Sequence, residues 1–538
     1  MKRKDFIRNS ALATLGLTTL AASSCDPHAA FRKNKSGEDD IGKFELDEMT
    51  VDQLQEKMKS GDYTSEKITN LYLDRIKEID KAGPAINSVI EINPDAVKIA
   101  KAMDEERKGG KIRGPLHGIP ILLKDNIDTG DQMMTTAGAL AMEGHKASKD
   151  AFVAKQLRAA GAVILGKTNL SEWANFRSTR SSSGWSSRGG QTKNPYVLDR
   201  SPCGSSSGSA VAVAASLCVV AVGTETDGSI ACPASMNGIV GIKPTVGLVS
   251  RTGIIPISKT QDTAGPFGRS LKDAVYLLAG MTGIDSDDPA TAGSEGKSKT
   301  DYTAYLDPAG LKGKRIGIEK TMLKKHEAVD ALLAKAIEQM KNAGATIVEV
   351  EFINKQNALG GDEFKVLEYE FKDGLNRYLS NANAPVKSLE DVIKYNKQNE
   401  AKAMPYFKQE ILDSCQAKGG LESKEYLDAL KKCGNLRKVI DDLLTSSKLD
   451  ALCGPATGTS WCIDFVNGDF WTGYGAYGPA AVAGYPSVTV PMGNVNEIPV
   501  GLSFLGRAYD EPGLITIAYG YEQVSKNRRA PEFKKSIS

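Results

Sequence analysis

Apolar residues recur with helical spacing in several segments of the chain, and short, continuous apolar runs follow most of these segments. In residues 64–80 the apolar positions fall on one face of a helix, and Thr64 is suited to cap its start. Gly161 and Gly344 each separate a helical segment from an apolar run. The predicted helices are 64–80, 95–107, 150–160, 327–342 and 513–524, and the predicted strands are 119–123, 162–165, 346–350, 449–453, 487–490 and 500–505. This alternation predicts an α/β fold, with a sheet covered by α-helices on both faces.

Residues 354–447 depart from this alternation, because they are polar, rich in lysine and mostly helical in pattern. We expect a helical insertion here. It is either a solvated addition to the fold or a cap over a substrate cleft, since long insertions in enzymes often frame the site.

The first residues have the pattern of an export signal. A positive head that includes Lys2 and Arg3 precedes a short apolar run at 11–22, which is too short for a stable transmembrane helix. We expect a signal peptide at 1–25, a polar linker at 26–43 and one domain at 44–538. Cys25 follows a loose lipoprotein box, so the alternatives are a lipid anchor at Cys25 and plain cleavage nearby. Either one predicts an exported protein, periplasmic or membrane-anchored.

Composition excludes several classes of function. The 538 residues carry a net charge of only +2, which gives no sign of a nucleic-acid surface. The chain has four histidines and no pair of cysteines in C-x-x-C spacing, so we expect no zinc site. Nothing in the sequence fixes the oligomeric state, and we expect a monomer or a simple homodimer.

Two glycine-rich stretches, 204–210 and 223–230, and one lysine at the end of an apolar run carry the candidate chemistry. A serine hydroxyl is a poor nucleophile without a base. Lys124 follows the apolar run directly, and burial would lower its pKa so that the amine could act as that base. Other candidate bases near the motifs are His117 and His145. A phosphate-binding loop is disfavoured, because no lysine follows the glycines.

The stretches 204–233, 238–245, 483–486 and 499–502 resemble the amidase signature family, and the likeness runs from about Leu46 to the C-terminus. It implies a large mixed central sheet and a serine hydrolase with a cis peptide bond at Gly204–Ser205. It also implies residue roles: Ser229 as nucleophile, Ser205 as the bridging serine, Lys124 as base, Ser206 as a supporting serine, and the N–H groups of Thr226, Asp227, Gly228 and Ser229 as the oxyanion hole.

Two positions depart from the usual family pattern, with Asp227 where most members have Gly and Ala231 where most have Arg. An anionic Asp227 aimed at a developing oxyanion would oppose catalysis, so its carboxyl must point elsewhere or be held protonated. The stretches 183–191, 194–196 and 224–233 resemble the peptide amidase branch. That resemblance implies hydrolysis of the C-terminal carboxamide of peptides, with release of ammonia and no metal or organic cofactor.

Other interpretations remain open at this stage. They are an exported amidase for other primary, aryl or fatty-acid amides, an amidotransferase subunit acting on charged transfer RNA, a thiol enzyme using Cys232, and a catalytically inactive amide-binding protein on the same fold. The export signal and the balanced charge argue against the amidotransferase.

The aromatic residues between 465 and 477 either line the pocket or are ordinary surface-loop residues: Phe465, Phe470, Trp471, Tyr474 and Tyr477.

Overall fold

The computed structural model of the chain describes residues 43–537. The predicted signal peptide, the possible lipid site Cys25 and nearly all of the predicted linker lie outside the described residues. Among the described helices, none is both long and apolar enough to cross a bilayer.

An eleven-stranded mixed sheet forms the centre of the fold, in the order β1-β3-β2-β6-β8-β7-β12-β13-β11-β9-β10. The strands are β1 Val89–Ile92, β2 Pro120–Lys124, β3 Val163–Thr168, β6 Val220–Glu225, β7 Val240–Lys243, β8 Thr263–Gly268, β9 Arg315–Glu319, β10 Thr346–Val350, β11 Ala451–Pro455, β12 Ser487–Val495 and β13 Ile498–Leu505, with a separate pair β4 Trp185–Ser186 and β5 Gly190–Gln191. β2 runs parallel to β3 and β6, whereas β8 is antiparallel to β6 and β7.

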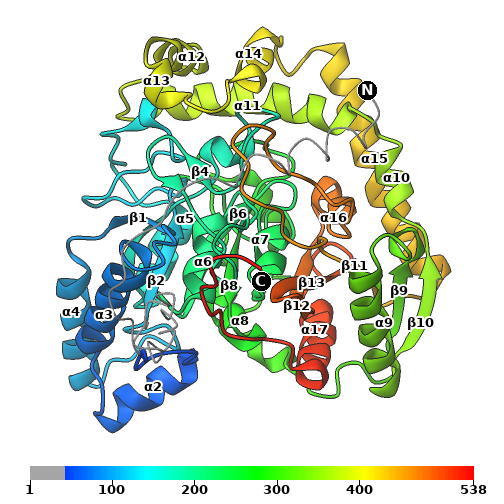
Figure 1. Cartoon of the computed structure of the whole chain (residues 1–538), viewed down its shortest axis with the longest axis horizontal. Helices are drawn as coiled ribbons and strands as arrows, with labels where there is room; N and C mark the ends of the chain where they lie inside the picture. The colour runs from blue at the N-terminus through cyan, green and yellow to red at the C-terminus, as the bar shows by residue number, and fades with distance from the viewer. Residues whose placement is uncertain (1–42, 538) are drawn as a thin grey trace, which may run out of the picture. The chain divides into compact units, whose positions relative to one another are not determined.

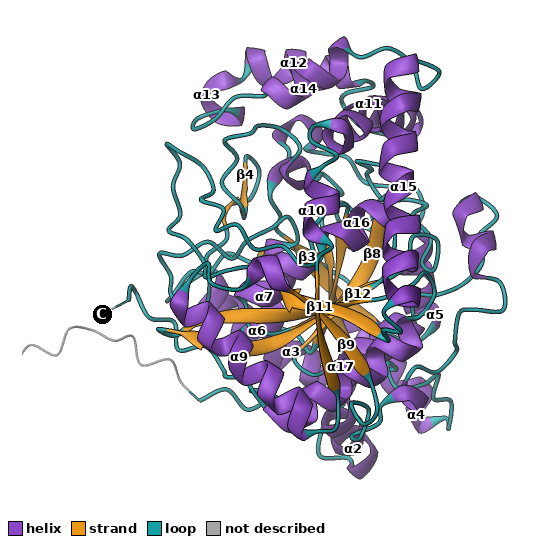
Figure 2. Ribbon diagram, turned by 90° about the vertical axis from the view of Figure 1, so that its right-hand side faces the viewer, coloured by secondary structure: helices purple, strands orange, loops and turns teal. Residues whose placement is uncertain are grey.

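Helices surround this sheet (Figure 1). They are α2 Val51–Ser60, α3 Ser65–Arg75, α4 Ala96–Lys108, α5 Phe152–Ala159, α6 Ser207–Ala214, α7 Ala231–Met236, α8 Leu271–Ala279, α9 Glu327–Asn342, α10 Ile353–Asn357, α11 Asp362–Asn381, α12 Leu389–Gln398, α13 Glu400–Ala403, α14 Glu410–Ala417, α15 Lys424–Ser446, α16 Gly478–Ala483 and α17 Glu511–Ser525. Figure 2 shows the strands fanned out in a twisted sheet with helices around them. Strands β2, β3, β6 and β8 are buried along their whole length, as expected when helices cover both faces. The predicted α/β fold with a large mixed sheet is therefore confirmed.

Local sequence signals explain where several helices begin. Thr64 accepts a hydrogen bond from the Lys67 backbone N–H and so caps α3, as the sequence predicts. Thr50 and Gln53 form a reciprocal capping box at the start of α2. α9 and β10 coincide with the segments predicted from the sequence.

The segment predicted as an insertion, 354–447, contains α11 to α15 and most of α10. In Figure 1, α11 to α14 lie together beyond one end of the sheet, and α15 runs from there along its side. Buried apolar residues of α11 and α12 pack with Trp173 and Phe176 in a cluster of their own, apart from the main core. This places α11 beside the loops that follow the central strands.

Candidate active site

Lys124 is the last residue of β2, and its amine is fully buried. The Nζ atom lies 2.8 Å from Ser205 Oγ, 3.0 Å from Ser206 Oγ and 2.8 Å from Thr224 Oγ1. Burial lowers the pKa of Lys124 to about 7, although Asp262 and Glu225 oppose the shift electrostatically. A substantial fraction of the amine is therefore neutral near neutral pH and able to accept a proton.

Ser205 and Ser206 lie in the turn that leads into α6, and the Gly204–Ser205 peptide bond is cis. Ser206 Oγ donates to the Thr224 carbonyl at 2.9 Å and accepts from the Thr224 N–H at 3.1 Å. α6 consists of small residues because it is packed closely on all sides. A Cβ added at Gly208 would lie only 2.2 Å from the Ser88 carbonyl oxygen. The two serines are thus fixed against β6 from one side and Lys124 from the other.

Ser229 lies in the short turn between β6 and α7. The Glu225 carboxylate organises this turn, since its Oε2 accepts hydrogen bonds from the backbone N–H groups of Ile230 at 2.7 Å and Ala231 at 2.9 Å. Within the described chain, the four predicted oxyanion-hole N–H groups, from Thr226 to Ser229, donate no hydrogen bond to a protein acceptor. They are therefore available to a substrate oxygen.

The predicted catalytic residues come together, but not through an unbroken chain of hydrogen bonds. Lys124 contacts Ser205 directly, and the Ser206 N–H donates to the Ser229 carbonyl oxygen at 3.3 Å. Among the described contacts there is no hydrogen bond between the Ser205 and Ser229 hydroxyls. Ser229 lines a cavity of about 280 Å³.

The walls of this cavity are mainly apolar and aromatic. α11 contributes Phe364 and Leu367, and the loop before α16 contributes Trp471 and Tyr477. The other aromatic residues of that loop lie elsewhere, because Tyr474 is buried, Phe470 is 72% exposed and Phe465 stacks on Tyr406. The pocket interpretation of the aromatic loop thus holds for two of its five residues.

Asp227 also lines the cavity, and it faces a second carboxyl, Glu363 of α11. Burial, reinforced by Glu363, raises the pKa of Asp227 well above its usual range. Of the two alternatives drawn from the sequence, the structure favours a carboxyl that holds a proton. Glu363 lies more than a hundred residues from the serine motifs, so no local pattern could have marked it. Thr224, in contrast, lies inside a stretch that the sequence already singled out.

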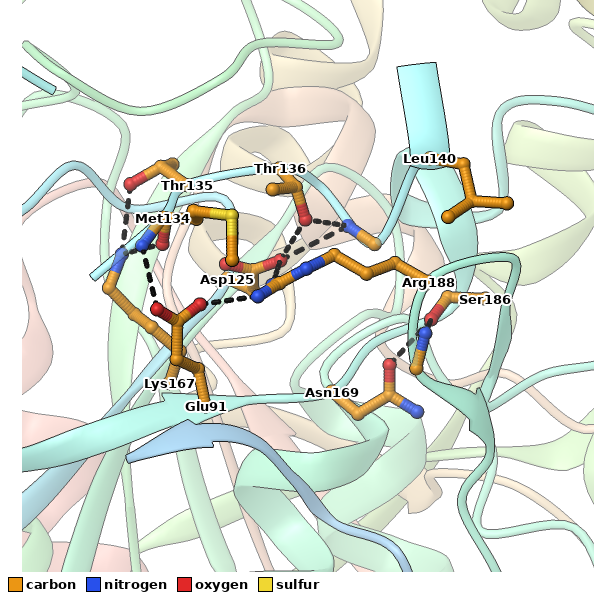
Figure 3. A network of polar contacts seen from close by, with 12 residues as sticks. Glu91, Asp125, Met134, Thr135, Thr136, Leu140, Lys167, Asn169, Ser186 and Arg188 are labelled. Atoms are coloured by element: carbon orange, nitrogen blue, oxygen red, sulfur yellow. Dashed lines mark hydrogen bonds and ion pairs between the residues drawn. The ribbon is translucent and has the colours of Figure 1, made fainter. Parts of the chain in front are cut away.

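A polar network fixes the chain immediately after Lys124 (Figure 3). The Asp125 carboxylate accepts from the Gly138 N–H at 3.3 Å and from Arg188 at 3.4 Å, and it also bonds the Thr136 hydroxyl. Arg188 forms a second ion pair with Glu91. Through the ion pair between Arg188 and Asp125, the stretch 183–191 therefore helps to hold the end of β2, where Lys124 lies.

The remaining candidate groups form no hydrogen bond with the catalytic serines in the described structure. Cys232 forms a disulfide with Cys203, so it has no free thiol and a thiol mechanism is excluded. His117 Nε2 lies 2.9 Å from the Met103 carbonyl oxygen, and His145 Nε2 lies 3.0 Å from the Tyr378 hydroxyl. Neither histidine is hydrogen-bonded to Ser205 or Ser229, which leaves Lys124 as the base in contact with the site.

Comparisons with known proteins agree with this geometry. The profile of the Amidase family matches residues 67–515. A probable amidase of Arabidopsis thaliana is 41% identical over 91% of this chain and 92% of its own length. The crystal structure of native peptide amidase from Stenotrophomonas maltophilia is 52% identical, covers 91% of this chain and 100% of that one, and superposes with a TM-score of 0.88. An amidase family protein from Bacillus anthracis is 39% identical over 90% of this chain and 93% of that one, with a TM-score of 0.83. The chain therefore belongs to the amidase signature family of serine hydrolases that act on amides.

Proposed function

We propose that this amidase hydrolyses the C-terminal carboxamide of peptides and releases ammonia. The observation that carries the proposal is the likeness to the Stenotrophomonas peptide amidase, which extends over nine-tenths of this chain at 52% identity. The cavity beside Ser229 supports it, because its described walls are mainly aromatic and apolar and include no lysine, arginine or histidine. A neutral carboxamide suits such a cavity, whereas a free C-terminal carboxylate would find no cation there.

In the proposed mechanism, neutral Lys124 accepts the proton of Ser205 while Ser205 accepts that of Ser229. Ser229 Oγ attacks the carboxamide carbon, and the oxyanion lies against the N–H groups of residues 226–229. The proton returns through Ser205 to the nitrogen, the C–N bond breaks, and ammonia leaves an acyl-enzyme. Water then attacks the acyl carbon by the same route, which gives the peptide acid and restores the Ser229 hydroxyl.

Ammonia release from a short N-blocked peptide amide tests this proposal. We expect the wild type to release ammonia without cleaving internal peptide bonds, and we expect Ser229→Ala and Lys124→Ala to abolish nearly all release. Ser446→Ala, on the exposed side of α15, is the matched control and should retain full activity. Turnover of aryl or fatty-acid amides but not of peptide amides would overturn the substrate. The absence of turnover of every amide would favour the inactive binding protein.

We further propose that the protein is exported through residues 1–25 and acts as a monomer or simple homodimer, with Cys25 as the site of a lipid anchor. The support is the positive head followed by a short apolar run. The mass of the mature N-terminus tests the anchor. An acylated Cys25 that is lost in Cys25→Ser would establish it, and an unmodified N-terminus downstream would exclude it.

A further inference from the structure

Asp227 lies between Glu363 and the cavity that Ser229 lines. Asp227 lines the cavity together with Ser229, whereas Glu363 does not line it. The Asp227 Oδ1 atom is fully buried, and no described donor bonds to it. An acceptor oxygen left without a donor at a substrate cavity is costly unless a ligand or a shared proton satisfies it. Asp227 is therefore a position at which a substrate group or a proton is expected.

The contact between Asp227 and Glu363 brings two acceptors together, so it is a hydrogen bond only when one carboxyl carries a proton. Gln261 Nε2 donates to Glu363 Oε1 at 3.0 Å, which stabilises the charged form of Glu363. Burial raises the pKa of both carboxyls. In contact, the two carboxyls share a proton, and the hydrogen bond from Gln261 favours Glu363 as the member that keeps the charge.

The surroundings of the pair do not cancel that charge. Asp469 is a second acid in the cavity wall, and it accepts hydrogen bonds from Ser183 and from Trp461 Nε1. Lys243 is the cation that opposes the pKa shift of Asp227, but it is buried behind the wall, and its amine donates to the carbonyls of Pro244 and Tyr485. Besides the free N–H groups of residues 226–229, the cavity thus presents the carboxyl groups of Asp227 and Asp469 to whatever binds beside Ser229.

We propose that the Asp227–Glu363 pair is the element that distinguishes the carboxamide from the carboxylate at the scissile position. This inference rests on the proposed function and deepens it. A carboxamide nitrogen is uncharged and carries two N–H donors, so it can donate to a carboxyl oxygen of Asp227, which lines the cavity. A carboxylate offers only acceptors and a negative charge. The pair therefore favours the amide substrate and expels the acid product. Asp227 touches the substrate in this arrangement, and Glu363 acts through Asp227 as a positioning residue.

Direct binding to the full chain carrying Ser229→Ala, which cannot form the acyl-enzyme, tests the proposal. Calorimetry gives the Kd of an N-blocked peptide amide and of the matching peptide acid, and the quantity of interest is the acid-to-amide ratio. We expect the acid to bind at least tenfold more weakly, because its carboxylate would be brought beside a like charge at a low effective dielectric constant. Adding Glu363→Gln removes the charge of the pair and should reduce the ratio at least fivefold.

Glu370→Gln is the matched control, because it removes a carboxylate from the same helix about 10 Å further along the axis. Glu370 accepts from Ser258 and Tyr426 and does not line the cavity of Ser229, so the ratio should stay at its starting value. Asp227→Asn, which keeps the shape of the side chain, is the second variant should Glu363→Gln fail to fold, and it should also reduce the ratio.

An unchanged ratio in a folded Glu363→Gln or Asp227→Asn variant would overturn the proposal. Failure of the proposed function is a separate result, because it is the absence of peptide-amide turnover by the wild type. In that event the same measurement is made with whichever primary amide the wild type hydrolyses and with the corresponding acid. The ratio then reports on Asp227 and Glu363 independently of the peptide.

Discussion

Gly228 lies directly beneath the ring of Tyr477, so that a Cβ added at Gly228 would lie 2.5 Å from the tyrosine hydroxyl oxygen. Gly228 also has a φ of +78°, which side-chain-bearing residues rarely adopt. The turn that presents the N–H groups of residues 226–229 thus depends on a residue without a side chain, held against an aromatic wall of the cavity.

Gly228→Ala should lower kcat by about 10²- to 10³-fold, comparable to the loss of an oxyanion-hole donor. The added methyl group would displace the turn or Tyr477. Gly110→Ala is the matched control, because Gly110 has a φ of +80° and no atom within 4 Å of the added Cβ. Steady-state kinetics should show full activity for Gly110→Ala, and similar kcat values for both variants would contradict this account.

The rate should depend on pH through Lys124. Burial lowers the pKa of this lysine to about 7, so its amine is protonated below that pH and cannot accept a proton. We expect kcat/KM for the amide to fall about tenfold per pH unit below 7 and to level off above it. In Lys124→Ala, the pH profile of the residual kcat/KM should lack the decrease that begins near pH 7. If kcat/KM of the wild type instead changed with an apparent pKa near 10, the ordinary value for a lysine, the amine would not be desolvated during catalysis.

The Cys203–Cys232 disulfide joins the segment before Ser205 to the helix after Ser229, across 29 residues of sequence. Replacing both cysteines by serine should lower the free energy of unfolding by about 3 kcal/mol, because the unfolded chain is no longer constrained. Denaturant unfolding measures this value. Cys462→Ser changes an exposed free cysteine and should leave stability unchanged. Equal stability of the double variant and the wild type would show that the bridge contributes nothing.

Arg188→Ala should destabilise the protein by about 3–5 kcal/mol, because it removes the cation that forms ion pairs with the fully buried Asp125 and the mostly buried Glu91. Arg377→Ala removes a largely exposed ion pair with Asp373 and should cost less than about 1 kcal/mol. Thermal or denaturant unfolding compares the two variants directly. A cost for Arg188→Ala no greater than that of the exposed pair would refute the support assigned to this network.

Periodicity located several elements with a clear helical or apolar pattern, and it missed β1, β9 and the strands β6, β7 and β8 at the centre of the sheet. α9 and β10 follow their patterns closely, and Thr64 marks the start of α3. β6, β7 and β8 carry glycine, threonine and proline at buried positions, and their neighbours in the sheet, rather than their own propensity, make them strands.

In the candidate site, too, the sequence identifies some residues and misses others. Lys124, Ser205 and Ser229 were identified from motifs, because the chemistry restricts the residue types within each stretch. Glu363 and Phe364 were not, since they reach the site only through the packing of α11 against distant loops. No local sequence signal encodes a contact between segments that are more than a hundred residues apart.

The origin of the cavity walls has a consequence for how this protein can diversify. Lys124 and the turn around Ser229 belong to β2 and to the end of β6 in the sheet, whereas Glu363, Phe364 and Leu367 belong to a helix inserted between β10 and β11. Amino-acid changes in α11 can therefore alter which amides enter without disturbing the residues that break the bond. The catalytic residues and the residues that select the substrate lie in different parts of the fold, so selection can change substrate preference while the catalytic residues are preserved.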